Sequence, residues 1–205
     1  TSVVDVPLAI RVADCVPVAF LGDRCVGVAH AGWRGLRAGI LERTVEAMKR
    51  LDGITPVVAV VGPHIGACCY EFGDADLDDL ADLFGSSIRS TTTAGRPALD
   101  LSSALSGILD GAGIPVTHDG ACTSCDDRYW SFRATATARR QAMVAWTDCK
   151  PSRGPTSLMS TSGVMDSAGF KVRSVKGPGW GLLRHHASFF HQRGVLHQLA
   201  LEVRQ

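Results

Sequence analysis

Apolar and polar positions alternate in short blocks along the first 147 residues. Four blocks are rich in β-branched and apolar residues and are typical of buried strands. They cover residues 8–12, 16–20, 25–29 and 57–61. The turn at 21–24 separates the second block from the third, so these two are expected to form a hairpin. A last strand is expected at 141–147.

Three other stretches carry apolar residues at helical spacing. The first covers 36–51, and its apolar face is formed by Leu36, Ile40, Val45 (or Leu41) and Met48. The second covers 74–84, with Leu77, Leu80, Leu83 and Phe84 on its face. The third begins after Asp100 as its cap, turns Leu101, Leu105, Ile108 and Leu109 inward, and ends at Gly111 or Gly113. This order of elements predicts an α/β (α+β) fold, with mixed β-sheets layered with helices.

The balance of charge changes near residue 148. Residues 1–148 carry 13 basic and 18 acidic side chains, whereas 149–205 carry 8 basic and 2 acidic ones. The segment 149–155 contains two prolines and a glycine and is typical of a linker. We therefore expect one domain at 1–148 and a basic, Gly/Ser/Pro-rich tail at 149–205, on which no structure is imposed.

Composition indicates a soluble, cytoplasmic protein, expected to be a monomer without a membrane or nucleic-acid partner. Hydrophobic residues make up 45% and charged residues 20%, and no run of about 18 apolar residues occurs. The seven cysteines are an odd number without the spacing of a disulfide framework, so reduced thiols are expected. The start shows no Met and no signal peptide, so the chain is expected to begin inside a longer protein.

A thiol and an imidazole stand near the outer ends of the predicted hairpin. They belong to Cys15 and His30, which are expected to be neighbours. Such a pair makes two ligands of a metal site or a nucleophile with its base; the alternative without function is a buried thiol and a hydrogen-bonded histidine. Asp14 lies beside the thiol, and Arg34 adds a cation in a glycine-rich turn that suits an anion.

Two further loops contain candidate ligands. One holds His64 and the adjacent Cys68 and Cys69, which are not expected to bind one metal because neighbouring residues of an extended chain point to opposite sides. The other holds Cys122-x-x-Cys125, a zinc-knuckle or redox spacing that lacks a second CxxC.

Aromatic residues and histidines complete the candidates. Tyr129, Trp130 and Phe132 stand next to Arg133, and they form either a stacking and anion-binding wall or part of the core. Four of the seven histidines lie in the tail, and they are expected to be surface residues without a function.

Four motifs, taken in this order, resemble the laccase-domain family. They are Ala13-Asp14-Cys15, HAGWRG at 30–35, GPHIGACCYE at 62–71, and Cys122-Thr123 followed by Trp130-Ser131-Phe132-Arg133. The family includes proteins called polyphenol oxidases, purine nucleoside phosphorylases and peptidoglycan-editing factors. The resemblance implies a zinc-dependent enzyme that phosphorolyses adenosine, inosine, guanosine or methylthioadenosine and deaminates adenosine. Some members are linked to copper-dependent phenol oxidation or to cell-wall precursor editing.

The resemblance also implies site residues. It makes Cys15 and His30 ligands of Zn²⁺, or of Cu²⁺ in oxidase members, together with a histidine upstream of both. No histidine precedes His30, so the chain looks like a member that lacks its N-terminal third to half; His64 or His118 is a conceivable substitute. The family also has a Thr-Gly-Arg motif further along the chain, and Arg140 matches only its last residue.

Residue type and placement predict three catalytic groups. Arg34 and Arg133 are expected to hold phosphate or developing charge, and Asp14 to orient a ligand or transfer a proton. Two alternatives remain open. The Cys/His spacing also resembles that of the necrotizing-factor toxin deamidases, which would make the protein a metal-free thiol hydrolase. The chain could also be an inactive remnant.

Overall fold

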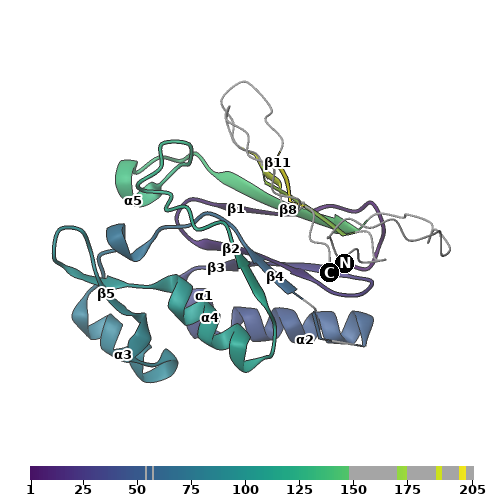
Figure 1. Ribbon diagram of the computed structural model, residues 1–205, viewed down its shortest axis with the longest axis horizontal. Coiled ribbons are helices and arrows are strands. Elements are labelled where there is room, and N and C mark those ends of the chain that lie inside the picture. The colour runs from purple at the N-terminus through teal and green to yellow at the C-terminus, as the bar shows by residue number, and fades with distance from the viewer. Residues whose placement is uncertain (54, 57, 148–169, 175–187, 191–198, 202–205) are drawn as a thin grey trace, which may run out of the picture.

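Two β-sheets and a layer of helices form the fold (Figure 1). The computed structural model describes residues 1–53, 55–56 and 58–147, with the strand segments 170–174, 188–190 and 199–201. The central sheet has the order β3-β2-β4-β7. Its strands are β2 (Val16–Leu21), β3 (Val26–Ala31), β4 (Val58–Val61) and β7 (Val116–His118). The β2–β3 and β2–β4 pairs are antiparallel and β4–β7 is parallel, which confirms the mixed α/β prediction.

The second sheet is built around β8 (Gln141–Thr147), which pairs antiparallel with β1 (Leu8–Val12). Three strands from beyond residue 148 join it: β9 (Phe170–Ser174), β10 (Ser188–Phe190) and β11 (Leu199–Leu201). The tail histidines lie outside the described residues. A separate short ribbon pairs β5 (Arg89–Thr91) with β6 (Pro97–Leu99).

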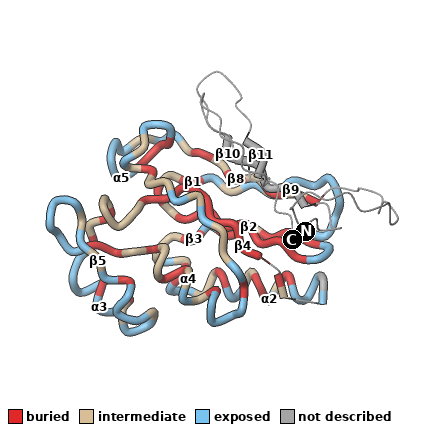
Figure 2. The backbone as a smooth tube through the Cα atoms, in the orientation of Figure 1, coloured by how far each residue is buried: buried red, intermediate tan, exposed pale blue. Residues whose placement is uncertain are grey.

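The central sheet is covered on both faces, because successive side chains of a strand point to opposite sides. On β2, Val16, Val18 and Phe20 face the helices, and Ala19 and Leu21 face the second sheet. All six residues of this strand are therefore buried, and Figure 2 shows buried backbone along the layer between the helices and the second sheet. This double burial explains why the predicted strands are continuously apolar.

Five α-helices and two 3₁₀ turns occur within the described residues. They are α1 (Trp33–Arg37), α2 (Ile40–Asp52), η1 (Ala67–Cys69), α3 (Asp74–Phe84), η2 (Ser86–Ile88), α4 (Leu101–Gly111) and α5 (Phe132–Thr135). The α2 helix lies beneath the central sheet in Figure 1, and α3 lies beside β5. No helix among the described residues is long and apolar enough to cross a bilayer.

The helix predictions are mostly confirmed, with two corrections. The single helix predicted over 36–51 is wrong, because Gly39 takes a left-handed φ of +72° and separates α1 from α2. The predicted α3 is confirmed in its bounds, but its Leu83 is 57% exposed and does not face the core. The cap on α4 is confirmed, since an Asp100 carboxylate oxygen accepts a hydrogen bond of 3.0 Å from the Ser103 backbone N–H.

Candidate functional site

The β2–β3 hairpin brings Cys15 and His30 to the same end of the central sheet. The ladder pairs Val16 with Ala31 and Pro17 with His30. A Cβ atom added to Gly32 would lie 2.8 Å from the Cys15 Sγ, so the thiol packs directly on this glycine. Residues two apart on a strand share a face, which makes Cys15 and His30 diagonal neighbours. The expected proximity is present, and their role as ligands stays a prediction.

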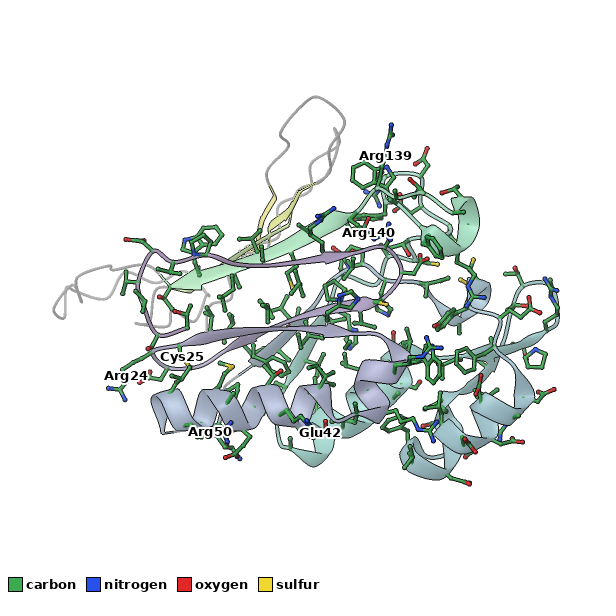
Figure 3. All side chains as sticks on the ribbon, turned by 180° about the vertical axis from the view of Figure 1, so that it is seen from behind. Arg24, Cys25, Glu42, Arg50, Arg139 and Arg140 are labelled. Carbon is green, nitrogen blue, oxygen red and sulfur yellow. The ribbon has the colours of Figure 1, made fainter. Side chains whose placement is uncertain are left out.

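Both groups point toward the second sheet. The alternation along β2 that turns Ala19 and Leu21 to that side includes Cys15. There the half-buried Arg140 immediately precedes β8, and its charge acts on Cys15 and on His30. Figure 3 shows Arg139 and Arg140 in the upper part of the view, right of the centre, and Cys25 at the lower left.

The surroundings keep both members of the pair neutral. Burial raises the pKa of the Cys15 thiol and the Asp14 carboxylate raises it further, while Arg140 opposes them. Burial, and then the charge of Arg140, lower the pKa of His30. A nucleophilic cysteine needs a lowered pKa, so this environment does not favour the thiol hydrolase. The neutral imidazole is the form that binds metals.

Asp14 joins three segments of the chain. Its carboxylate accepts hydrogen bonds from the Thr123 Oγ1 at 2.8 Å and from the Arg133 backbone N–H at 2.7 Å. Its carbonyl oxygen accepts another from the Ile65 N–H at 2.9 Å. Only 8% of this residue is exposed. These contacts hold the loops at the site in place, which is a positioning role.

The two arginines predicted to be catalytic have different surroundings. The Arg133 guanidinium lies 5.0 Å from the centre of the Tyr70 ring. Burial and the neighbouring Cys15 raise the pKa of Tyr70, whereas Arg133 lowers it, so these groups are adjacent. The Arg34 guanidinium lies 4.2 Å from the centre of the Trp33 ring, on the first turn of α1.

The histidines considered as a third ligand are placed elsewhere. His64 is buried, and its Nδ1 lies 2.9 Å from the Gly62 carbonyl oxygen and its Nε2 2.7 Å from the Ser102 Oγ. His118 ends β7, three strand spacings from His30, or about 14 Å. Neither histidine is therefore supported as the third ligand, and the roles of Cys15 and His30 as the other two stay a prediction from the resemblance.

Four other cysteines form a second group of potential ligands. The Sγ atoms of Cys68, Cys69, Cys122 and Cys125 all lie within 4.8 Å of one another. The prediction that adjacent cysteines would diverge is wrong, because they lie in the 3₁₀ turn η1 and not in an extended chain. The thiols that lie close to the Cys122-x-x-Cys125 motif are those of Cys68 and Cys69, and not those of a second CxxC.

A basic pocket is lined in part by Arg140, whose charge also acts on Cys15 and His30. It has a volume of about 600 Å³ and is lined by Arg11, Trp130, Ala138, Arg139 and Arg140. The Arg139 guanidinium lies 6.0 Å from the centre of the Trp130 ring. The Nη1 of Arg140 donates to the carbonyl oxygens of Thr137 at 2.9 Å and Arg139 at 2.7 Å. Three guanidinium groups around one pocket suit a phosphate.

Sequence reasoning missed most of this pocket. In the sequence, Arg140 stands out only as the last residue of a family motif, and no pattern marks Arg11. Arg11 enters the pocket because β1 pairs with β8, which places it opposite Ala142. The aromatic residues that were predicted to form a wall differ in burial. Tyr129 and Trp130 are buried, whereas 55% of Phe132 is exposed.

The described residues therefore define an α/β domain with a Cys/His pair and a basic pocket at one end of its central sheet. The chain belongs to the family described as "Multi-copper polyphenol oxidoreductase laccase", which matches residues 1–148. This is the family that the four sequence motifs indicated.

Named relatives support this assignment. The chain is similar to a purine nucleoside phosphorylase of Aquifex aeolicus, with 45% identity over 73 residues, covering 36% of this chain and 35% of the relative. It is 36% identical over 137 residues to the purine nucleoside phosphorylase YlmD of Geobacillus stearothermophilus, covering 62% and 50%. Protein NMB0706 of Neisseria meningitidis has a similar solved structure, with a TM-score of 0.62, 32% identity and coverages of 69% and 60%. The chain thus spans roughly half the length of such relatives.

Proposed function

We propose that this chain is part of an enzyme that cleaves purine nucleosides with phosphate. The observation that carries the proposal is the position of Arg140, which lines the basic pocket and acts electrostatically on both Cys15 and His30. Arg140 therefore links the proposed anion site to the two side chains that are proposed as metal ligands. The purine nucleoside phosphorylase names of the relatives point to the same substrates.

The basic pocket holds the phosphate in this proposal. Arg11, Arg139 and Arg140 offer guanidinium donors, whose fork geometry matches phosphate oxygens. In phosphorolysis, a phosphate oxygen forms a bond to C1′ of the ribose while the bond from C1′ to the purine nitrogen breaks. The purine leaves with the electron pair and takes up a proton. Arg133, next to Tyr70, is placed to stabilise the charge that develops.

The Cys15–His30 pair provides sulfur and nitrogen, the donors that zinc prefers. Both face one side of the sheet, and this fits a shared ion when a third ligand is added. A bound zinc would supply a Lewis acid toward phosphate or water. The same donors also bind copper. Metal analysis of the purified chain therefore has to distinguish zinc from copper. Asp14 contributes by fixing the surrounding loops.

Phosphate-dependent release of the purine base tests this function. The purified chain is incubated with adenosine, inosine, guanosine or methylthioadenosine and with phosphate, and chromatography detects base and ribose 1-phosphate. Inosine formed from adenosine reports deamination, and a phenol substrate reports oxidation. Loss of one charged hydrogen-bond donor costs about 1.5–3 kcal/mol, so Arg140→Gln should lower kcat/KM by roughly 10- to 100-fold.

The matched control is Arg43→Gln, on the exposed surface of α2, where kcat/KM should not change. Equal activity in both variants, or release of base that is independent of phosphate, contradicts the proposal. Inactivation by iodoacetamide that chelators do not reproduce would instead favour the thiol hydrolase.

A further inference from the structure

Four thiols converge where the loop after β4 meets the loop after β7. The Sγ–Sγ distances are 3.7 Å for Cys68–Cys122, 3.6 Å for Cys68–Cys125 and 3.3 Å for Cys69–Cys125. All four Sγ atoms lie within 4.8 Å of one another. Of the described cysteines only Cys15 and Cys25 lie outside this group.

Backbone hydrogen bonds hold the two loops together independently of the thiols. The His64 N–H donates to the Ala121 carbonyl oxygen at 3.3 Å, and the Thr123 N–H donates to the His64 carbonyl oxygen at 2.9 Å. Both contacts belong to an isolated parallel bridge between His64 and Cys122. The thiols are thus brought together by a preformed backbone arrangement.

Three of the six sulfur–sulfur distances match a four-thiolate zinc site, and the other three are at most 4.8 Å. Zinc binds cysteine sulfur at about 2.3 Å in a tetrahedron, which places the sulfur atoms about 3.8 Å apart. The three distances given above lie within 0.5 Å of that value, with a slight contraction at Cys69–Cys125. Small movements of the side chains are enough to complete the tetrahedron.

Gly66 adds a second feature of a thiolate site. Its backbone N–H donates to the Cys122 Sγ at 3.1 Å, a contact that stabilises a charged sulfur. A Cβ atom at this position would lie 3.2 Å from the Cys68 Sγ and 3.5 Å from the Cys122 Sγ. A glycine here lets the backbone approach the sulfur atoms closely.

We propose that Cys68, Cys69, Cys122 and Cys125 bind a structural zinc ion. Four thiols release their protons and bind one Zn²⁺, and the closed coordination leaves no position for a substrate. This site is separate from the Cys15–His30 pair. The ion ties together the loops that contain Ile65 and Thr123, both of which donate hydrogen bonds to Asp14. It therefore supports the loops at the phosphorolysis site without taking part in the reaction.

Metal analysis of the full chain tests the proposal. The protein is purified under reducing conditions, and its zinc is measured by mass spectrometry. Cys15→Ala should retain one zinc ion per chain, whereas Cys125→Ser and Cys68→Ser in that background should lose it. Cys25→Ala is the matched control, because Cys25 is buried beside α2 (Figure 3) and does not belong to the cluster of four thiols.

Spectroscopy on the otherwise unaltered chain covers the case in which a variant does not fold. X-ray absorption of the Cys15→Ala protein should show four sulfur neighbours, and cobalt substitution should give a thiolate-to-cobalt absorption band. The proposal is overturned if Cys15→Ala binds no metal, or if mass spectrometry of the protein as purified shows a Cys69–Cys125 disulfide in place of zinc. Failure of phosphorolysis alone leaves these readouts unchanged, so the two proposals are tested separately.

Discussion

Asp14 holds three segments together while its own backbone is in an unfavourable conformation. Its φ is +91°, which L-residues rarely adopt and which costs about 1–3 kcal/mol. The hydrogen bonds from Thr123 and Arg133 help to offset this cost. The sequence indicated Asp14 as a site residue because it adjoins Cys15. The partners of its carboxylate could not be predicted, since they lie more than 100 residues away.

Tyr129 is a buried residue whose hydroxyl group has no hydrogen-bond partner among the described residues. Such a group costs about 1–3 kcal/mol, so Tyr129→Phe is expected to leave the free energy of unfolding unchanged or to raise it. Urea denaturation at pH 7 measures this. A clear loss of stability would show that the hydroxyl has a partner.

The same substitution has an expected pH dependence. Burial, followed by the charge of Asp119, raises the pKa of Tyr129 above its ordinary value of about 10. Above about pH 10 the phenol ionises more readily in the unfolded chain than in the folded one. The free energy of unfolding is therefore unaffected by this group below about pH 10, and it falls as the pH rises toward the higher folded pKa. Tyr129→Phe should lose less stability than the parent chain between about pH 9 and 11. An equal loss in both proteins would contradict the expectation.

At the scale of elements, local signals predicted what local contacts determine. The Asp100 cap and the bounds of α3 and β8 depend on residues close in sequence, and they were predicted correctly. The division between α1 and α2 was missed because apolar residues continue at helical spacing across Gly39. The η1 turn was missed for a similar reason, since three residues are too few to show a period.

Gly32, between β3 and α1, is required for space and not for its backbone angles. Its φ of −79° is ordinary, but a Cβ atom would lie 2.8 Å from the Cys15 Sγ. Gly32→Ala is therefore expected to displace the thiol and to cost about 1–3 kcal/mol of unfolding free energy. Urea denaturation measures the cost.

Gly107 provides the matched control for this substitution. It lies within α4, and a Cβ atom there would meet nothing within 4 Å. Gly107→Ala should stabilise the chain by about 0.5–1 kcal/mol, because alanine favours the helix. Similar effects of both substitutions would show that space around Cys15 does not determine the outcome.

At the scale of the whole molecule, the buried apolar residues within the described part of 1–147 extend from Val12 to Ala145. The family match ends at residue 148, close to the change in charge. We propose that residues 1–148 form the domain and that the later strands extend its second sheet through β8.

Deletion of residues 149–205 tests this boundary. The shortened chain should keep a cooperative urea transition and its zinc, because both core clusters and the four clustered cysteines remain. Some stability should be lost, since β8 becomes an edge strand. A broad, non-cooperative transition compared with the full chain would place the later strands within the domain itself.

The sequence by itself determined the family, the strands β1 to β4 and β8, the bounds of α3 and α4, and the proximity of Cys15 and His30, because periodicity, capping and a hairpin operate over short distances. The short strands β5, β6 and β7 were not predicted. Only the tertiary structure decided three other features: the contacts of Asp14, the basic pocket and the cluster of four thiols. Each unites residues from distant segments, as Asp14 and Arg133 are 119 positions apart. Such contacts arise from how the sheets and loops pack, and no local pattern along the chain encodes them.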